Sequence, residues 1–291
     1  MQTKHQIQHL LTSAGVRPNK RFGQHFLIDL NLMRLLIDSA NIDNNDVVLE
    51  VGCGTGSLTS ELIERAGFVV AVELDRTLTE IANNNLVNVN NIELINVDIL
   101  ENKHTLSHEV VSALESAHQK YNGRILLVAN LPYNVASPTI MNLQIGKLVV
   151  NEMYITVQKE VADRVTASPG SHDYSILSIL LNAVGDARII RILRPSVFWP
   201  QPQVDSAMVG FVRRQEKLNR IKNMDLFVEI VNLFMSHRRK TLTACSKLAS
   251  VKLAEKSINW PEIFEKCGID PKKRPEKLSS EDYIDISNIC F

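Results

Sequence analysis

No stretch of this sequence approaches the roughly 20 consecutive apolar residues that a transmembrane helix requires, and the first fifteen residues lack the apolar core of a secretory signal peptide. The four cysteines show no Cys-x-x-Cys spacing, and the eight histidines show no spacing typical of metal ligands. These absences predict a cytoplasmic protein with free thiols and no metal site. An organellar origin stays open, although the first nineteen residues carry one arginine, Arg17, and do not resemble an Arg-rich transit peptide.

The sequence has no excess of positive or negative charge, because 32 basic residues balance 32 acidic ones. Hydrophobic residues make up 45% and charged residues 22% of the 291 residues, which are ordinary values for a globular protein and argue against disorder. Residues 215–291 contain 14 basic and 11 acidic side chains, whereas the remainder contains 18 and 21. This mild asymmetry permits a local basic patch but does not by itself establish a nucleic-acid binder.

Short apolar runs that alternate with helical segments indicate an α/β fold up to about residue 214. The expected strands are 47–51, 68–73, 92–97, 125–129, 152–157, 187–193 and 204–212. Because these runs are apolar throughout, they suit central parallel strands that are covered by helices on both faces. We therefore predict a doubly wound, Rossmann-like sheet.

The remainder of the chain has no strand-like run. Residues 226–235 and 247–254 have helical spacing, and Pro261 can open another helix. The sequence thus predicts two domains, a Rossmann-like domain at 1–214 and a small helical domain at 215–291.

The segment Asn130-Leu131-Pro132-Tyr133 closes the apolar run 125–129. It places a side-chain amide, a carbonyl freed from strand pairing by the proline, and an aromatic face at one strand end. Two acceptors that grip the hydrogens of an adenine amino group favour the pyramidal geometry needed for attack, while Tyr133 holds the ring by stacking. The alternative is an ordinary strand-to-helix turn, and the tetrapeptide alone does not decide between them.

A glycine loop and two acids supply the context. Glu50-Val51-Gly52-Cys53-Gly54-Thr55-Gly56 follows the first strand, and glycines let the backbone pass close to a ligand. Glu73 ends the second strand, where an acid can bind the two hydroxyls of a ribose, and Asp98 follows the third, where it can accept from an adenine amino group. Taken one at a time, each acid has a structural alternative to ligand binding: Glu73 could cap the next helix, and Asp98 could begin a turn.

These four strand-end features, in this order, resemble class I methyltransferases that use S-adenosylmethionine. Further stretches narrow the resemblance to one family, the rRNA adenine N6,N6-dimethyltransferases. These stretches are 20–29, which contains Phe22-Gly23-Gln24-His25-Phe26-Leu27, then 158–164, 174–178, 198–206, 236–242, 268–271 and 274–276.

The resemblance implies site residues, position by position. Cofactor contacts are implied for His25, Leu27, Gly52, Glu73, Asp98 and Asn130, with residues 20–29 folding over the cofactor. The amine is oriented by Asn130 and by the carbonyl of Leu131 or Pro132. Tyr133 and Phe198 sandwich the extruded base. Arg238, Arg239 and Lys240 grip RNA phosphates, although a run this short can also be a solvated helix end.

Two departures from the family pattern stand out. Cys53 occupies a position where the family usually has proline, and Thr55 one where it has a small or apolar residue. The corner at 198–206 carries Trp199, Gln201 and Gln203 where the family often has prolines and a lysine, which removes a possible phosphate contact. Trp199 could touch RNA or pack into the core between the domains.

The function implied by the resemblance is N6-dimethylation of two adjacent adenosines in the 3′-terminal hairpin loop of small-subunit (16S) rRNA, within the immature 30S subunit, by a monomer. Extruding loop bases costs little. Three alternatives stay open: a methyltransferase of large-subunit rRNA that confers macrolide resistance, a ribosome-assembly factor that acts chiefly by binding, and a nicotinamide oxidoreductase, which fits the strand pattern only.

Overall fold

The computed structural model describes residues 1–19, 22–146, 148–249, 253 and 258–291. Lys20 and Arg21 of the N-terminal motif, and residues 250–252 and 254 of the helix expected at 247–254, lie outside these residues. The chain divides into two compact units, one formed by Met1–Ala162 and Arg188–Val212 and the other by Asp163–Ala187 and Arg213–Phe291. Relative to the expected boundary at 214, the second unit also contains residues 163–187.

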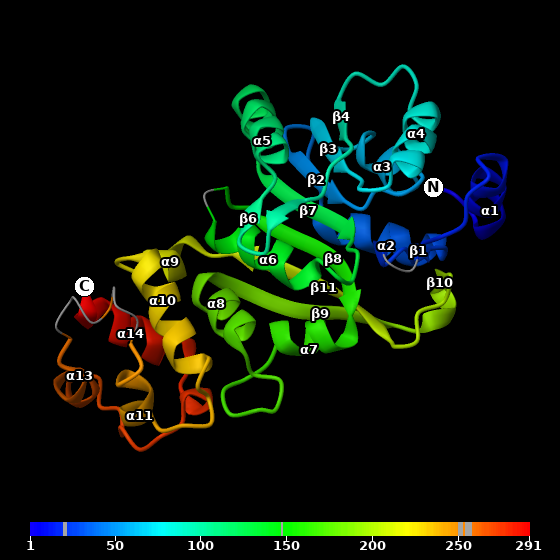
Figure 1. Cartoon of the computed structure of the whole chain (residues 1–291). Coiled ribbons are helices and arrows are strands. Elements are labelled where there is room, and N and C mark those ends of the chain that lie inside the picture. Colours follow the sequence, from blue (N-terminus) through cyan, green and yellow to red (C-terminus); the bar gives the residue numbers. More distant parts are fainter. Residues whose placement is uncertain (20–21, 147, 250–252, 254–257) are drawn as a thin grey trace. The chain divides into compact units, whose positions relative to one another are not determined.

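The first unit is built on a seven-stranded sheet with the order β4-β3-β2-β7-β8-β11-β9 (Figure 1). The strands are β2 (Val47–Val51), β3 (Phe68–Val72), β4 (Ile92–Ile95), β7 (Ile125–Asn130), β8 (Glu152–Gln158), β9 (Gly185–Leu193) and β11 (Ser206–Arg213). Neighbouring strands from β4 to β8 pair in parallel, and β11 pairs antiparallel with β8. All seven expected strands are present, and the predicted α/β class is confirmed.

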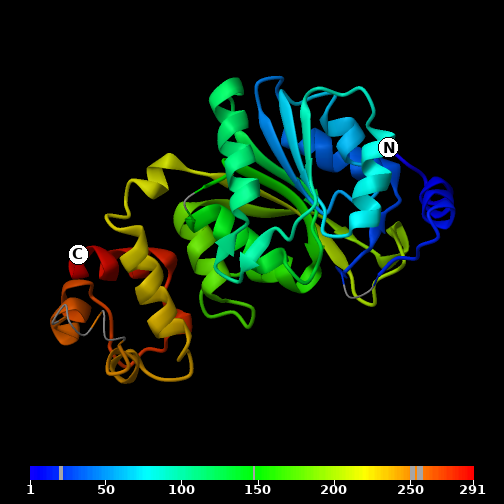
Figure 2. The ribbon, with the colours of Figure 1, turned by 45° about the horizontal axis from the view of Figure 1, so that its top comes forward.

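Helices cover the sheet because its central strands are apolar on both sides. Every residue of β2 is buried, so neither face of this strand can meet water. Helix α2 (Leu30–Ala40) packs on β7 and β8, and α5 (His108–Tyr121) packs on β2 and β3. Figure 2 shows these helices on opposite sides of the sheet. Asp29 starts α2 by accepting hydrogen bonds from the backbone N–H groups of Asn31 and Leu32.

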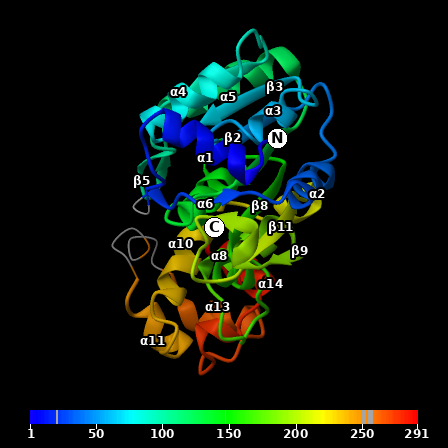
Figure 3. The ribbon, with the colours of Figure 1, turned by 90° about the vertical axis from the view of Figure 1, so that its right-hand side faces the viewer.

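Shorter elements complete this unit. They are α1 (Lys4–Ser13), β1 (Phe26–Leu27), α3 (Thr59–Leu62), α4 (Arg76–Asn85), β5 (Leu100–Asn102), β6 (Thr105–Leu106), α6 (Ala136–Ile145), α7 (Lys159–Val165), which runs into the second unit, and the pair η2 (Pro195–Val197) and β10 (Phe198–Trp199). Strand β1 pairs antiparallel with β10. Helix α1, seen from outside in Figure 3, buries Ile7 and Leu11 against Leu78 and Ile81 of α4.

Apart from the ends of β9 and β11, the regular elements of the second unit are helices over the residues described. It contains α8 (Ile176–Val184), α9 (Gln215–Leu218), α10 (Met224–Met235), α11 (Leu242–Ser246), α13 (Trp260–Lys266), η3 (Pro275–Lys277) and α14 (Ser280–Cys290). Its core includes Phe234, whose ring meets those of Trp260, Phe264 and Tyr283. Segment 163–187 belongs here because the Tyr174 hydroxyl donates to the carbonyl of Leu278 (2.9 Å). The helices expected at 226–235 and at Pro261 are confirmed.

Two expectations from composition concern membrane spans and cysteines. In the parts of the chain that the structure describes, no helix is long and apolar enough to cross a membrane. All four cysteines are free thiols, as predicted, and Cys53 and Cys245 are buried.

The amino ends of β2 and β7 are joined by an ion pair. Asp46, whose side chain is 3% exposed, accepts from the Arg124 guanidinium (2.6 Å) and from the Arg124 backbone N–H (3.0 Å). The same guanidinium donates to Glu152 (2.8 Å) and to the Asn41 carbonyl (2.8 Å). These hydrogen bonds raise the pKa of Arg124, which stays charged.

We expect Arg124→Met to lower the free energy of unfolding by about 2 kcal/mol, because it leaves the Asp46 carboxylate buried without its partner. This is less than the roughly 3–5 kcal/mol of a fully buried pair, since a third of the Arg124 side chain is exposed. Arg65→Met breaks an exposed pair with Asp38 and serves as the control, at a cost of about 0.5 kcal/mol or less. Urea denaturation measures both, and equal losses would contradict the structural role of Arg124.

Candidate active site

The glycine loop after β2 lies directly against the Asn-Leu-Pro-Tyr segment after β7. Gly52 has a φ of +79°, and a Cβ atom built on it would lie 2.8 Å from Cγ of Pro132. Gly54 has a φ of +58°, and its Cβ would lie 2.9 Å from Cε1 of Phe26. Side chains at these positions would therefore clash as well as strain the backbone. The two motifs from the sequence meet at one place, with the N-terminal segment beside them.

Two hollows share Gly52 in their walls. The first is lined by Ile7, Phe26, Leu27, Met33, Leu36, Glu50, Gly52, Cys53, Gly54, Thr55, Ser57, Leu58 and Asn130. The second is lined by Phe22, Val51, Gly52, Val72, Glu73, Leu74, Val97, Asp98, Ile99, Pro132, Asn134 and Val135. Of the six predicted cofactor residues, five line one or both hollows. His25 lines neither, so its side chain is not part of these walls.

Glu73 and Asp98 lie at the second hollow, as expected. Glu73 is 7% exposed, and its carboxylate accepts hydrogen bonds from the backbone N–H groups of Gly54 (2.9 Å) and Asp75 (2.9 Å). Burial raises its pKa. It does not cap α4, because Asp75 performs that role through the N–H groups of Thr77 and Leu78. Asp98 does begin a turn, since its carboxylate accepts from the backbone of Leu100, but it stays exposed to the hollow.

Glu50 is a candidate site residue that the sequence analysis did not select. It lines the first hollow and is 2% exposed, and among the described residues its Oε2 has no hydrogen-bond partner. Burial, and to a smaller extent the negative charge of Glu73, raise the pKa of Glu50 to about 8, whereas the neighbouring Thr59 hydroxyl lowers it. An unpaired buried carboxyl that faces a cavity is suited to a cationic ligand group. The sequence signal that could have identified Glu50 is its position as the one acid within an otherwise apolar strand.

The Asn130 amide is held at both of its ends. Its Nδ2 donates to the backbone carbonyl of His25 (2.7 Å), and its Oδ1 accepts a short hydrogen bond from the Thr156 hydroxyl on β8. This pairing fixes which end of the amide is the acceptor. The backbone N–H of Leu131 donates to the Thr156 carbonyl (3.1 Å), so the same residue also fixes the turn. Sequence reasoning missed Thr156, because its role depends on the pairing of β8 with β7.

The backbone carbonyls after Asn130 differ in availability. The carbonyl of Pro132 accepts from the N–H of Val135 (3.2 Å). Among the described residues, the carbonyl of Leu131 has no recorded partner. Of the two carbonyls that the sequence analysis left open, Leu131 is therefore the one free to accept from a ligand.

The aromatic residues at the site are arranged differently from the expected sandwich. The Tyr133 hydroxyl bonds to that of Ser206 (2.7 Å), and its ring stacks on His25 at 5.3 Å between centroids. His25 in turn contacts the carbonyl of Pro200 through Nδ1 (2.7 Å). Phe198 does not face a hollow in this structure. It is 1% exposed and belongs to a core cluster with Leu27, Leu193 and Met208, because β10 pairs with β1.

The two unusual loop residues and Trp199 have structural roles. Thr55 exchanges hydrogen bonds with Gln2, whose side-chain N–H donates to the Thr55 carbonyl (3.1 Å) and whose side-chain oxygen accepts from the Thr55 hydroxyl (2.6 Å). This fastens the start of α1 beside the first hollow. Cys53 is packed in the core. Trp199 stacks on Phe26 at 6.2 Å and packs within the first unit.

The predicted phosphate-binding residues Arg238, Arg239 and Lys240 follow α10 in the second unit, and all three are exposed. Arg238 donates to the backbone carbonyl of Tyr174 (3.4 Å). Within the described ranges, no group of three or more His, Cys, Asp and Glu residues could hold a metal ion.

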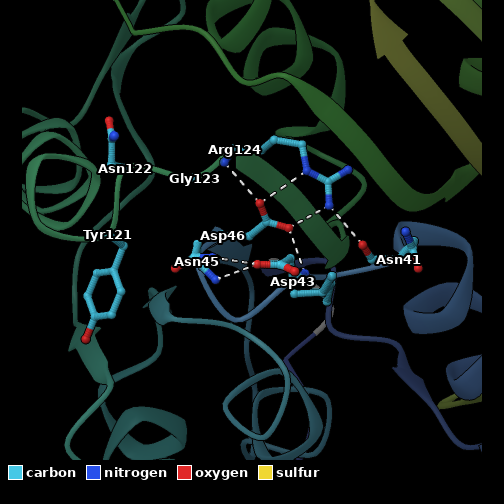
Figure 4. A pocket seen from close by; sticks show the side chains of 9 residues that line it. Asn41, Asp43, Asn45, Asp46, Tyr121, Asn122, Gly123 and Arg124 are labelled. Carbon is cyan, nitrogen blue, oxygen red and sulfur yellow. Dashed lines mark hydrogen bonds and ion pairs between the residues drawn. The ribbon is translucent and has the colours of Figure 1, made fainter.

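A further hollow lies at the amino ends of the strands (Figure 4). Its walls include Asn41, Asp43, Asp46, Tyr121 and Arg124. The charged groups there already bond to one another, as the dashed lines in Figure 4 show. Ligands of parallel α/β sheets bind at the carboxyl ends of the strands, so this hollow is not the candidate active site.

Comparison with known proteins agrees with this geometry. The family model described as ribosomal RNA adenine dimethylase matches residues 15–290. A relative from Alkaliphilus oremlandii, ribosomal RNA small subunit methyltransferase A, is 38% identical over 272 residues, which cover 93% of this chain and 91% of the relative.

Two solved structures have the same fold. A dimethyladenosine transferase from Plasmodium falciparum superposes with a TM-score of 0.70 at 24% identity, over 90% of this chain and 96% of its own. The 23S rRNA methyltransferase ErmE gives 0.63 at 21% identity, over 90% and 98%. Together with the match across residues 15–290, the glycine loop and the Asn-Leu-Pro-Tyr segment that it touches identify the chain as a member of the ribosomal RNA adenine dimethylase family.

Proposed function

We propose that this protein transfers methyl groups from S-adenosylmethionine to N6 of two adjacent adenosines in the 3′-terminal hairpin loop of small-subunit rRNA, each twice. The observation that carries the proposal is the Asn130 amide, whose Oδ1 is oriented by Thr156 at the contact between the glycine loop and Pro132. Family membership and the name of the Alkaliphilus oremlandii relative support the RNA substrate.

The residues around Gly52 fit S-adenosylmethionine. Gly52 lines both hollows and has no side chain, so a ligand could approach its backbone closely. Glu73 would accept from the ribose hydroxyls and Asp98 from the adenine amino group, while the unpaired Glu50 carboxyl would receive the ammonium group. Leu27 would pack on the ligand, and His25 would act through its backbone. The cofactor, when bound, supplies an electrophilic methyl group.

The target amine needs acceptors more than a base. Asn130 Oδ1 and the free carbonyl of Leu131 would accept its two hydrogens, which localises the lone pair on N6 for in-line attack. Positive charge develops on N6 in the transition state, and both oxygens stabilise it. The methylated N6 then loses one proton to solvent and keeps one hydrogen, so one acceptor suffices to orient it for the second transfer.

The base would stack on Tyr133, whose ring is held by Ser206. For Phe198 to form the other side of the predicted sandwich, the segment around it must leave the core cluster, so this role is proposed for the RNA-bound state. Arg238, Arg239 and Lys240 would bind phosphates from the second unit. We further propose that a monomer acts in the cytoplasm on the immature 30S subunit.

The decisive experiment is transfer of labelled methyl groups to purified unmethylated small subunits, with mapping of the modified nucleotides. Four methyl groups on two adjacent adenosines near the 3′ end support the proposal. Labelling of large-subunit rRNA would instead favour the large-subunit enzyme, and tight binding without labelling would favour an assembly factor.

Asn130→Ala removes the oriented acceptor. We expect at least a hundredfold loss of methyl transfer, comparable to removal of an oxyanion-hole donor, with RNA affinity within about twofold of the wild type. Asn84→Ala, on the exposed side of α4, is the control and keeps full activity. Single-turnover transfer and filter binding measure the two quantities, and near-normal transfer by the Ala variant would refute the mechanism.

Thr156→Val keeps the shape of the side chain but removes the hydroxyl that orients Asn130. One hydrogen bond is worth about 1 kcal/mol, so we expect kcat to fall roughly five- to tenfold while KM for RNA stays near its wild-type value. Ser112→Ala, an exposed hydroxyl on α5, is the control. A change in KM alone would argue against a positioning role.

Cofactor binding should depend on pH through Glu50, whose pKa is about 8. Because the ammonium group of S-adenosylhomocysteine requires the carboxylate form, affinity for it rises up to tenfold per pH unit between pH 6 and 7.5. Glu50→Gln removes this slope. Without ligand, the stability of the fold has the opposite pH dependence. The contribution of Glu50 to the free energy of unfolding is fully present below its unfolded pKa and is lost as the pH rises through about 8. Calorimetry checks the first effect and thermal unfolding the second, and an unchanged slope in Glu50→Gln would exclude Glu50.

A further inference from the structure

The edge strand β9 and the residue directly after it carry a row of exposed arginines that the proposed function does not use. Arg188, Arg191 and Arg194 are all exposed, and residues 187–204 contain no Asp or Glu. Strand β9 ends the sheet, with β11 as its sheet neighbour, so these side chains flank an open margin. Alternation along the strand puts Arg188 and Arg191 on opposite sides of this margin, and Arg194 follows directly after the strand with an extended backbone. We call these three residues the β9 arginine row.

The row differs from three other arginines of the first unit in having no carboxylate partner. Arg65, Arg76 and Arg124 each pair with an acid. Among the described residues, no member of the row forms an ion pair. Three guanidinium groups without an acidic partner, spaced three residues apart, make this margin positively charged, and a polyanion would bind to it.

The row also leads to the candidate active site. Leu193 ends β9, and three residues separate Arg194 from Phe198 in β10, as the course of the chain in Figure 1 shows. The next turn supplies the Pro200 carbonyl that contacts His25, and His25 stacks on Tyr133. From Arg188 to Arg194 the strand extends about 20 Å away from this corner. A chain bound along the row therefore has one end beside Tyr133.

We propose that the β9 arginine row is a second phosphate-binding surface, which holds the RNA backbone adjoining the extruded adenosine. This inference rests on the proposed function and adds a contact surface on the first unit. Guanidinium groups bind phosphate oxygens in pairs, which suits them to a ribose-phosphate backbone. The row fixes the position of the RNA and not its sequence, since phosphates carry no base information.

Charged residues on an edge strand also prevent unwanted strand pairing. That role requires charge but no RNA, so the two explanations differ in one measurable quantity, the dependence of RNA affinity on salt.

The test uses the full chain with Arg188, Arg191 and Arg194 all changed to Gln. The probes are a synthetic RNA hairpin with two adjacent adenosines in its loop and purified unmethylated small subunits. Each lost phosphate contact lowers the slope of log affinity against log salt by about 0.7–0.9, so we expect a decrease of about 2 and a loss of affinity on the order of tenfold or more. Affinity for S-adenosylhomocysteine stays unchanged.

Two controls make the result specific. Arg76→Gln removes an exposed arginine that is already paired with Glu80, and it leaves the salt slope unchanged. Changing the three arginines to Lys keeps the charge and retains most of the slope. If the triple Gln variant fails to fold, Arg194→Gln alone should still lower the slope by nearly one.

The other outcomes overturn the inference in distinguishable ways. An unchanged slope with new aggregation makes the row an edge-protection device. Weaker binding to subunits with unchanged binding to the hairpin assigns the row to a ribosomal protein. If the wild type neither binds nor methylates either RNA, the proposed function itself fails.

Discussion

The site depends on the close approach of two backbone turns. The loop after β2 and the turn after β7 come from neighbouring parallel strands, so their carboxyl ends must meet at one edge of the sheet. They meet without a gap only because Gly52 has no side chain, since a Cβ would lie within 2.8 Å of Pro132. That contact sets the separation between the groups that would hold the cofactor and Asn130, which would hold the target amine. Transfer in line between two ligands requires such a fixed separation.

A second constraint links the covering segment to the same turn. Asn130 donates to His25 and accepts from Thr156, so one amide connects the N-terminal segment to β8. The amide cannot flip without losing both partners. The His25 ring lies on Tyr133, where a base would also stack. The same contacts that orient the acceptor therefore bring the covering segment next to the base site, and entry of a base requires this segment to adjust.

The sequence was sufficient to predict the features that depend on neighbouring residues. All seven strands, the glycine loop and the turn at Asn130 could be located because apolar runs and Gly or Pro residues determine local structure. The position of Phe198 was not predictable in this way. Its burial follows from pairing with Leu27, which is far away in the sequence, and an aromatic residue near a substrate corner gives no sign of such a pairing. Thr156 and the β9 arginine row likewise become recognisable only once the strand order is known.

Burying two acids, Glu50 in β2 and Glu73 directly after β3, costs free energy that a bound cation would offset. Glu50 and Glu73 are both buried, and each lacks a basic partner among the interactions that shift its pKa. Burial, and to a smaller extent the negative charge of Glu73, raises the pKa of Glu50 to about 8 in the free protein, which favours its protonated form near neutral pH. Glu73 keeps two backbone donors, whereas Oε2 of Glu50 has no partner among the described residues. A ligand that brings positive charge to Glu50 would release its proton. The site would thus recognise the cationic amino-acid end of the ligand in addition to its nucleoside.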